Sequence, residues 1–369
     1  MTIPFLNLQS IHFKLEAEML SAFQRVYNNN WFILGDELKS FEQLYSVKNK
    51  VNYCLGTSNG LDALILSMLG INLLPGDEVI LPSNTYIATA IAASHLGCKP
   101  VFVEPRLDTY NINPSLIEEK ITSCTKAIVP VHLYGQACEM DIILEISKKY
   151  NLKVIEDNAQ SHFSMFGGRF TGTWGDVNAT SFYPGKNLGA LGDAGAITTN
   201  DYEIYQKILA LRNYGSYKKY ENEYIGYNMR LDELQAAFLK IKLNHIESWI
   251  DERIQIASYY QKILSSVEQI ILPYTHEKAI HTFHLFVIRT KKRNDLQEFL
   301  HENGIGTLIH YPIPQHLQKS YSYLGHKKGD FPIAEEIAST CLSLPLWPGM
   351  TNNQIEYVCE RIIYFFKKK

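Results

Sequence analysis

Short apolar runs alternate with helix-like stretches between residues 50 and 200, and this alternation restricts the fold of the 369-residue chain more than any other feature. The predicted strands are residues 77–82, 100–103, 127–131, 153–156 and 177–182. Helical segments are predicted between them, at 85–95 and 141–150. Strands that alternate with helices indicate βαβ units and a mainly parallel sheet, so we expect an α/β protein.

The length of the chain indicates more than one domain. A long helix is predicted from Leu231 to Ile254, and it leads into a smaller C-terminal α/β region. We therefore expect a large domain at residues 1–249 and a small domain at residues 250–369. No low-complexity linker separates them, so the two domains should pack closely.

Composition excludes several classes of function. The chain is 46% hydrophobic and 20% charged with a net charge of −3, which gives no electrostatic reason to expect nucleic-acid binding. None of the six cysteines forms a CxxC pair, so neither a metal site nor a dense disulfide framework is indicated. The N-terminus lacks the form of a secretory signal, and the longest apolar stretch, 61–74, is too short to span a bilayer. We expect a cytoplasmic protein that does not bind a membrane.

A lysine in a glycine-rich turn is the strongest chemical signal. Lys186 follows the predicted strand 177–182 and a Pro-Gly pair, and a second run of small residues follows it at 188–195. Glycines on both sides permit close approach of the backbone to a ligand. An ordinary lysine is a solvated surface residue, but this setting favours a lysine that forms a Schiff base with a carbonyl compound.

Asp157 supplies a matching acid at the end of the apolar run 153–156. A carboxylate beside a pyridine nitrogen favours the protonated ring, which is the form that acts as an electron sink. A strand-end aspartate is also common as a helix cap, but together with Lys186 it predicts a site for pyridoxal 5′-phosphate (PLP). Asp157 and Ser181 both lie just past apolar runs, and ligands of parallel sheets bind at the carboxyl ends of strands.

Three further features complete the predicted cofactor site. Residues 56–60 precede an apolar helical run, so they can bind phosphate at a helix N-terminus, although many such turns only start a helix. Tyr86 follows a predicted strand and can either stack on a pyridine ring or pack in the core. Gln160 lies three residues after Asp157, where it can hydrogen-bond the ring hydroxyl oxygen.

With these segments in this order, the chain resembles the DegT/DnrJ/StrS family of nucleotide-sugar aminotransferases, which are fold-type I PLP enzymes. The resemblance covers nearly the whole chain and rests on residues 31–35, 56–63, 156–160, 181–195, 226–237 and 304–312. It implies an aspartate-aminotransferase-like α/β fold. In that fold a large PLP-binding domain with a mainly parallel mixed sheet is joined to a smaller C-terminal α/β domain.

The resemblance also implies roles for single residues. It makes Lys186 the catalytic Schiff-base lysine, Asp157 the partner of the pyridinium nitrogen and Gln160 the partner of the ring hydroxyl. The implied phosphate contacts are Ser181 and the backbone around Asn59, Gly60 and Leu61. Tyr86 is the implied stacking residue.

Two positions carry further implications. Many relatives have threonine where this chain has Leu61, so a hydroxyl contact to the phosphate is lost and backbone N–H groups or Asn59 must replace it. Asn228 matches an asparagine that reaches the phosphate bound by the partner subunit. The resemblance therefore implies a homodimer with shared active sites.

The finer resemblance concerns the substrate. Relatives that aminate C4 of the sugar often carry histidine where this chain has Tyr183. Residues 181–193 and 310–317 look more like the subgroup that aminates C3 of dTDP-3-oxo-6-deoxyhexoses. The implied substrate contacts are Tyr183, Lys219, Tyr311 and His316. A solvated loop is an equal expectation for Lys219, and a histidine such as His316 is often an ordinary loop residue.

The expected reaction moves the amino group of L-glutamate, through PLP, to C3 of the keto sugar. Its product, a 3-amino-3,6-dideoxyhexose nucleotide of galacto or gluco configuration, would serve a surface polysaccharide such as lipopolysaccharide O-antigen, or a glycosylated metabolite. Amination at C4 is the nearest alternative. A sugar dehydratase on the same fold is disfavoured by Lys186, because those enzymes have histidine there. The alternative from another class is a non-catalytic PLP-binding regulator.

Overall fold

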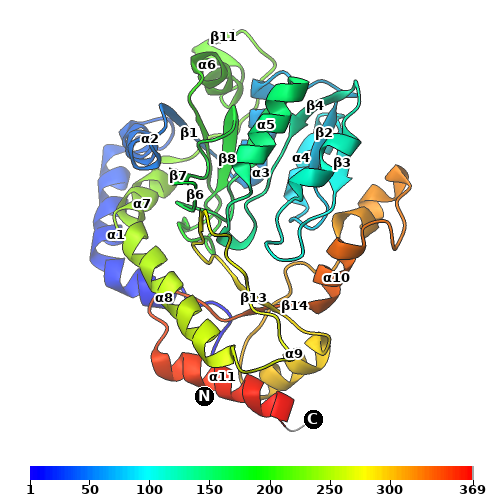
Figure 1. Cartoon of the computed structure of the whole chain (residues 1–369). Helices are drawn as coiled ribbons and strands as arrows, with labels where there is room; N and C mark the ends of the chain where they lie inside the picture. The colour runs from blue at the N-terminus through cyan, green and yellow to red at the C-terminus, as the bar shows by residue number, and fades with distance from the viewer. Residues whose placement is uncertain (368–369) are drawn as a thin grey trace.

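The computed structural model describes residues 1–367, and a seven-stranded mixed sheet forms the centre of its larger part (Figure 1). In spatial order the strands are β1 (Tyr53–Thr57), β9 (Gly195–Thr199), β8 (Val177–Ser181), β5 (Lys153–Asp157), β4 (Thr125–Ile128), β2 (Glu78–Pro82) and β3 (Lys99–Val103). The pairings among β8, β5, β4, β2 and β3 are parallel, whereas β9 is antiparallel to both of its neighbours. The prediction of a mainly parallel mixed sheet is confirmed.

Helices cover this sheet because its strands are apolar on both faces. They are α3 (Gly60–Gly70), α4 (Ala88–His95), α5 (Met140–Tyr150) and α6 (Tyr202–Leu211). Leu64 and Leu66 of α3 belong to the same buried cluster as Leu81 of β2 and Ile155 of β5. This packing fixes the N-terminus of α3 beside the ends of the central strands.

One predicted strand is shorter in the structure. Residues 127–131 were expected to be extended throughout, but β4 ends at Ile128. Pro130 has no N–H group for a ladder bond, and only its carbonyl takes part, accepting from Asp157 N at 2.9 Å. The chain then leaves the sheet beside Asp157.

The predicted helix over residues 231–254 consists of two helices. Asp232 caps α7 (Glu233–Leu243) by accepting from Gln235 N at 2.8 Å. After α7, Asn244 N donates to Ile241 O and His245 N donates to Lys242 O. This spacing of three residues is tighter than that of an α-helix, so α7 ends here before α8 (Ile246–Leu264) begins.

The predicted domain boundary at residues 249 and 250 falls inside α8. Trp249 and Ile250 pack in the core of the large domain, whereas Ile256 and Tyr260 pack in that of the small domain. Helix α8 therefore passes from one core to the other, and Figure 1 shows it running from α7 toward α11.

The small domain is built on an antiparallel strand pair. It contains β13 (Phe286–Arg289), β14 (Cys341–Leu344), α9 (Arg293–Glu302), α10 (Pro332–Thr340) and α11 (Asn352–Lys367). Ile3 from the start of the chain also lies in its core. The first residues of the chain therefore pack with the small domain, although the predicted large domain, residues 1–249, included them.

The remaining α-helices and strands are the first helices of the chain, which pack into the core of the large domain, and several short strands. They are α1 (Gln9–Asn29), α2 (Asp36–Asn49) and the short strands β6 (Met165–Phe166), β7 (Arg169–Phe170), β10 (Ser216–Lys218), β11 (Glu221–Asn222) and β12 (Ala279–Ile280). Over residues 1–367, no helix has the length and apolar character needed to cross a bilayer.

Candidate active site

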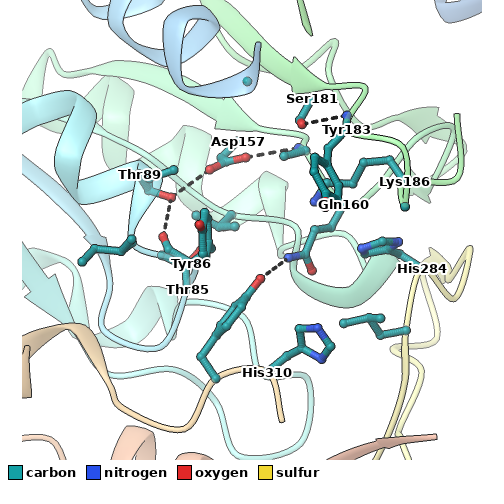
Figure 2. Close-up of a pocket in the computed structure, with 18 of the residues that line it drawn as sticks. Thr85, Tyr86, Thr89, Asp157, Gln160, Ser181, Tyr183, Lys186, His284 and His310 are labelled. Atoms are coloured by element: carbon teal, nitrogen blue, oxygen red, sulfur yellow. Dashed lines mark hydrogen bonds between the residues drawn. The ribbon is translucent and has the colours of Figure 1, made fainter. Parts of the chain in front are cut away.

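A cavity of about 770 Å³ lies where the parallel strands end and the small domain meets the large one (Figure 2). β5 ends in Asp157 and β8 ends in Ser181, so the sheet presents both side chains at the same edge. The cavity is lined by most of the predicted site residues: Asn59, Gly60, Leu61, Tyr86, Asp157, Gln160, Ser181, Tyr183, Lys186 and Tyr311.

Lys186 lies in the loop between β8 and β9. Its N–H donates to Tyr183 O at 2.8 Å, and a Cβ at Gly189 would collide with the Pro184 carbonyl, so the loop closes tightly only with glycine there. Burial lowers the pKa of the Lys186 amine to about 8, and the Asp157 carboxylate acts in the opposite direction. Roughly one tenth of this amine is therefore unprotonated at pH 7, far more than for an ordinary lysine, and the unprotonated form is the one that attacks a carbonyl.

Asp157 is only 5% exposed and is held at both carboxylate oxygens. Thr89 Oγ1 donates to Oδ2 at 2.8 Å and Ala159 N donates to Oδ1 at 3.1 Å (Figure 2). Burial raises the pKa of this carboxyl group, while the two hydrogen bonds and the Lys186 charge act to lower it. A cationic ring nitrogen beside the carboxylate would favour its ionised form further.

The N-terminus of α3 and the end of β8 form an anion cradle. The Asn59 side chain caps the helix, accepting from Asp62 N at 2.8 Å and donating to Asp62 Oδ2 at 2.9 Å. The first N–H groups of α3 are left for an anion, as at any helix N-terminus. Ser181 lies directly beside them, because a Cβ on Gly60 would be 2.6 Å from Ser181 Cβ. Two groups were expected to replace the missing threonine hydroxyl as phosphate ligands: backbone N–H groups or the Asn59 side chain. The Asn59 side chain is bonded to Asp62, so the free backbone N–H groups are the ones available.

Gln160 links the cofactor region to the small domain. Its Oε1 accepts from Tyr134 N at 2.8 Å and its Nε2 donates to Tyr311 Oη at 3.0 Å. The Tyr311 ring lies 5.3 Å from that of Tyr86. Tyr86 is 55% exposed, so it is not the core aromatic that the sequence left open as an alternative.

Three predicted site residues do not line the cavity of the single chain. Asn228 and Lys219 are exposed, and the Lys219 amine lies 5.1 Å from the ring centre of Tyr220. His316 is only 2% exposed, with Nε2 3.1 Å from Glu335 Oε1. Because its ring is buried, the structure does not support its predicted contact with substrate.

The sequence did not indicate several residues that line the cavity, namely Phe5, Leu6, Thr89, Arg253, His284 and His310. Thr89 carries a local signal, since it is a polar residue in the first turn of α4 and the next four residues, 90–93, are all apolar. Burial, reinforced by the Lys186 charge, lowers the pKa of His310 to about 4 and that of His284 well below its usual range. Both imidazoles are therefore neutral beside the lysine.

The residues of this cavity fit PLP. The anion cradle suits its phosphate, the buried carboxylate of Asp157 suits its ring nitrogen and the amine of Lys186 suits its aldehyde. Tyr86 offers an exposed aromatic face, and Gln160 offers an amide toward the same space. Each polar group of the cofactor would thus have a partner on the large domain.

Comparison with known proteins agrees with this chemistry. Residues 14–363 match the profile of the DegT/DnrJ/EryC1/StrS aminotransferase family. The chain is 51% identical over 360 residues, 98% of each chain, to a dTDP-3-amino-3,6-dideoxy-α-D-galactopyranose transaminase of Aneurinibacillus thermoaerophilus. Its structure is similar to that of DesV from Streptomyces venezuelae in complex with a ketimine intermediate, with a TM-score of 0.97, 41% identity and 99% coverage of each chain.

A second solved structure, NtdA from Bacillus subtilis, contains bound cofactor PMP, the aminated form of PLP. It is similar to this chain with a TM-score of 0.93 and 33% identity, over 99% of this chain and 85% of NtdA. The resemblance read from the sequence is confirmed: the chain belongs to the DegT/DnrJ/EryC1/StrS aminotransferase family.

Proposed function

We propose that this chain transfers the amino group of L-glutamate, by way of PLP, to C3 of a dTDP-3-oxo-6-deoxyhexose in the cytoplasm. The product is a dTDP-3-amino-3,6-dideoxyhexose. The observation that carries the proposal is the placement of Lys186 and the buried Asp157 in one cavity with an anion cradle. Similarity to the Aneurinibacillus transaminase, whose named product has this substitution pattern, supports C3 over C4.

The chain holds the cofactor at three points. Ser181 and the first N–H groups of α3 bind the phosphate, Asp157 binds the ring nitrogen and Gln160 binds the ring hydroxyl. When bound, PLP supplies the electron sink that allows a proton to leave the carbon bearing the amine. Thr89 acts as a positioning residue, because its hydroxyl fixes one oxygen of the Asp157 carboxylate.

Lys186 moves the proton. With a pKa of about 8, roughly 10% of its amine is free at pH 7, compared with well under 0.1% for an unperturbed lysine. In the donor half-reaction it takes the proton from Cα of glutamate. In the acceptor half-reaction it returns a proton to C3 of the sugar, while His284 and His310 beside it are neutral.

We infer a homodimer whose subunits share active sites. Asn228 and Lys219 are exposed and lie outside the cavity of their own chain, which suits contacts across an interface. Trp31, Phe32 and Ile33 are also exposed, at 64%, 46% and 41%, and such an apolar group favours a partner surface.

Absorption spectroscopy tests the function directly. L-glutamate should convert the lysine-bound PLP spectrum to that of the aminated cofactor, and a dTDP-3-oxo-6-deoxyhexose should restore it. The product NMR spectrum should place the new amine on C3; an amine on C4 would select the nearest alternative. Lys186→Ala should abolish the absorption spectrum of lysine-bound PLP, whereas the control Lys14→Ala, at an exposed position, should not change it. Absence of amino transfer from any donor would favour the alternative of a non-catalytic PLP-binding regulator.

A further inference from the structure

The first residues of the chain form a structural part of the cavity wall. Ile3 is fully buried, its N–H donates to Gly304 O at 2.8 Å and its carbonyl accepts from Gly306 N at 2.8 Å. These bonds fix residues 3–6 to the small domain, at the end of the molecule where Figure 1 shows the N-terminus. The segment is therefore an ordered element and not a loose end.

From this anchor the next two side chains reach the reaction centre. Leu6 Cδ2 would lie 3.3 Å from a Cβ on Gly185, the residue directly before Lys186. The Phe5 ring lies 5.7 Å from that of His310, which is 5.4 Å from that of Tyr311. Phe5 and Leu6 thus bridge the lysine loop and the 308–311 segment of the small domain.

Three leucines continue the same surface. Leu308, Leu344 and Leu346 line the cavity together with Phe5 and Leu6, and we call these five residues the apolar wall. The polar groups of PLP have their proposed partners on the large domain, at Asp157, Gln160, Ser181 and Lys186, and none of them is on the apolar wall. The apolar wall is therefore left to face the substrate.

We propose that Phe5 and Leu6 are specificity-determining residues that select a 6-deoxy sugar by receiving its C6 methyl group on the apolar wall. The inference rests on the proposed function, because it assigns which residues recognise that substrate. A methyl group gains from apolar contact, whereas a C6 hydroxyl would be buried against five side chains that offer it no hydrogen-bond partner. Rejection of an added hydroxyl by an apolar surface is worth about 100-fold in kcat/KM.

The sugar half-reaction run in reverse measures this selectivity with stable compounds. A 3-amino sugar nucleotide gives its amino group to PLP, so the sugar carbon becomes a ketone and the cofactor becomes pyridoxamine phosphate. The rate is followed in the holoenzyme by loss of the lysine-bound PLP absorption. The two probes are dTDP-3-amino-3,6-dideoxyhexose and its 6-hydroxy counterpart, dTDP-3-amino-3-deoxyhexose, of the same configuration.

The wild-type holoenzyme should prefer the 6-deoxy probe by about 100-fold. Leu6→Ser, which places a hydroxyl on the wall, should reduce that ratio at least 10-fold, to about 10 or less. Phe5→Leu keeps the wall apolar and should keep the preference. Thr2→Ala, at an exposed position of the same segment, is the matched control and should leave it unchanged.

The inference is overturned if Leu6→Ser keeps the wild-type ratio. It is also overturned if Leu6→Ser slows both sugars and the glutamate half-reaction by one common factor, because the segment then only positions the Lys186 loop. Reaction of neither amino sugar with the wild-type enzyme refutes the proposed function, and the inference with it. Reaction of both sugars at similar rates refutes the inference alone.

Discussion

Replacement of Gly60 by alanine tests how closely the helix and the strand that form the anion cradle must approach. The new Cβ would lie 2.6 Å from Ser181 Cβ and 3.2 Å from Ser181 Cα. Carbon atoms that are not bonded normally approach to about 3.5–4.0 Å, so α3 and β8 must separate by roughly 1 Å. Neither element yields easily, because β8 is paired on both edges and Leu64 and Leu66 of α3 are buried.

Two effects of opposite sign set the change in stability. Alanine favours a helix over glycine by up to about 1 kcal/mol, whereas overpacking costs about 1–3 kcal/mol. We expect the free energy of unfolding of the cofactor-free protein to fall by about 1 kcal/mol. The loss in cofactor binding should be larger, because the separation weakens at least one charge-assisted bond to the phosphate. Such a bond contributes about 1.5–3 kcal/mol, or roughly a 10- to 100-fold change in Kd.

The measurements are urea unfolding and titration of the cofactor-free protein with PLP. Ser181→Gly removes the atom that the new methyl group would strike, so it completes a double-mutant cycle. In the Ser181→Gly background, Gly60→Ala should reduce stability and PLP affinity much less, because only the 3.2 Å approach to the Cα of residue 181 remains. Wild-type affinity for PLP in the single variant Gly60→Ala would refute the reasoning, as would an undiminished effect in the double variant.

Three further outcomes are expected. Because burial lowers the pKa of Lys186 to about 8, and only the neutral amine attacks, the rate of PLP incorporation should rise with pH and reach half its maximum near pH 8; a midpoint near 10.5 would contradict this. Glu156→Gln should lower the free energy of unfolding in urea by about 3 kcal/mol. The reason is that the buried Glu156 carboxylate accepts hydrogen bonds from Gly172 N at 2.8 Å, from Gly175 N at 2.9 Å and from His132. The control Glu277→Gln, at an exposed position, should change this free energy little. Mixing inactive Lys186→Ala and Asn228→Ala proteins should restore about one quarter of wild-type activity if sites are shared, and none if each site lies within one chain.

Much of the site was predictable because its residues are marked by their position along single elements. Asp157 and Ser181 were identified as residues just past apolar runs, and the structure places both at strand ends that line the cavity. Lys186 was identified by small residues on both sides of it. Such signals are local, since strand ends, helix starts and glycine turns depend on a few neighbouring residues.

Other features were beyond local reasoning. The break between α7 and α8 contains no glycine or proline, so the pattern reads as one continuous helix. His316 lies in a segment that resembles the family, yet its ring is buried 4.7 Å from that of Phe331. Whether a side chain faces a cavity or a core depends on what packs against it, and that partner is distant in sequence.

The sequence by itself determined the order of helices and strands, the α/β class and most of the predicted residues that line the cavity, because periodicity and turn residues act over short range. Only the tertiary structure decided which distant residues complete the site. Thr89 holds Asp157 across 68 positions of sequence, and Leu6 reaches the loop of Lys186 from the start of the chain. Contacts of this kind follow from the summed packing of whole elements, in which no single residue pattern indicates the partner.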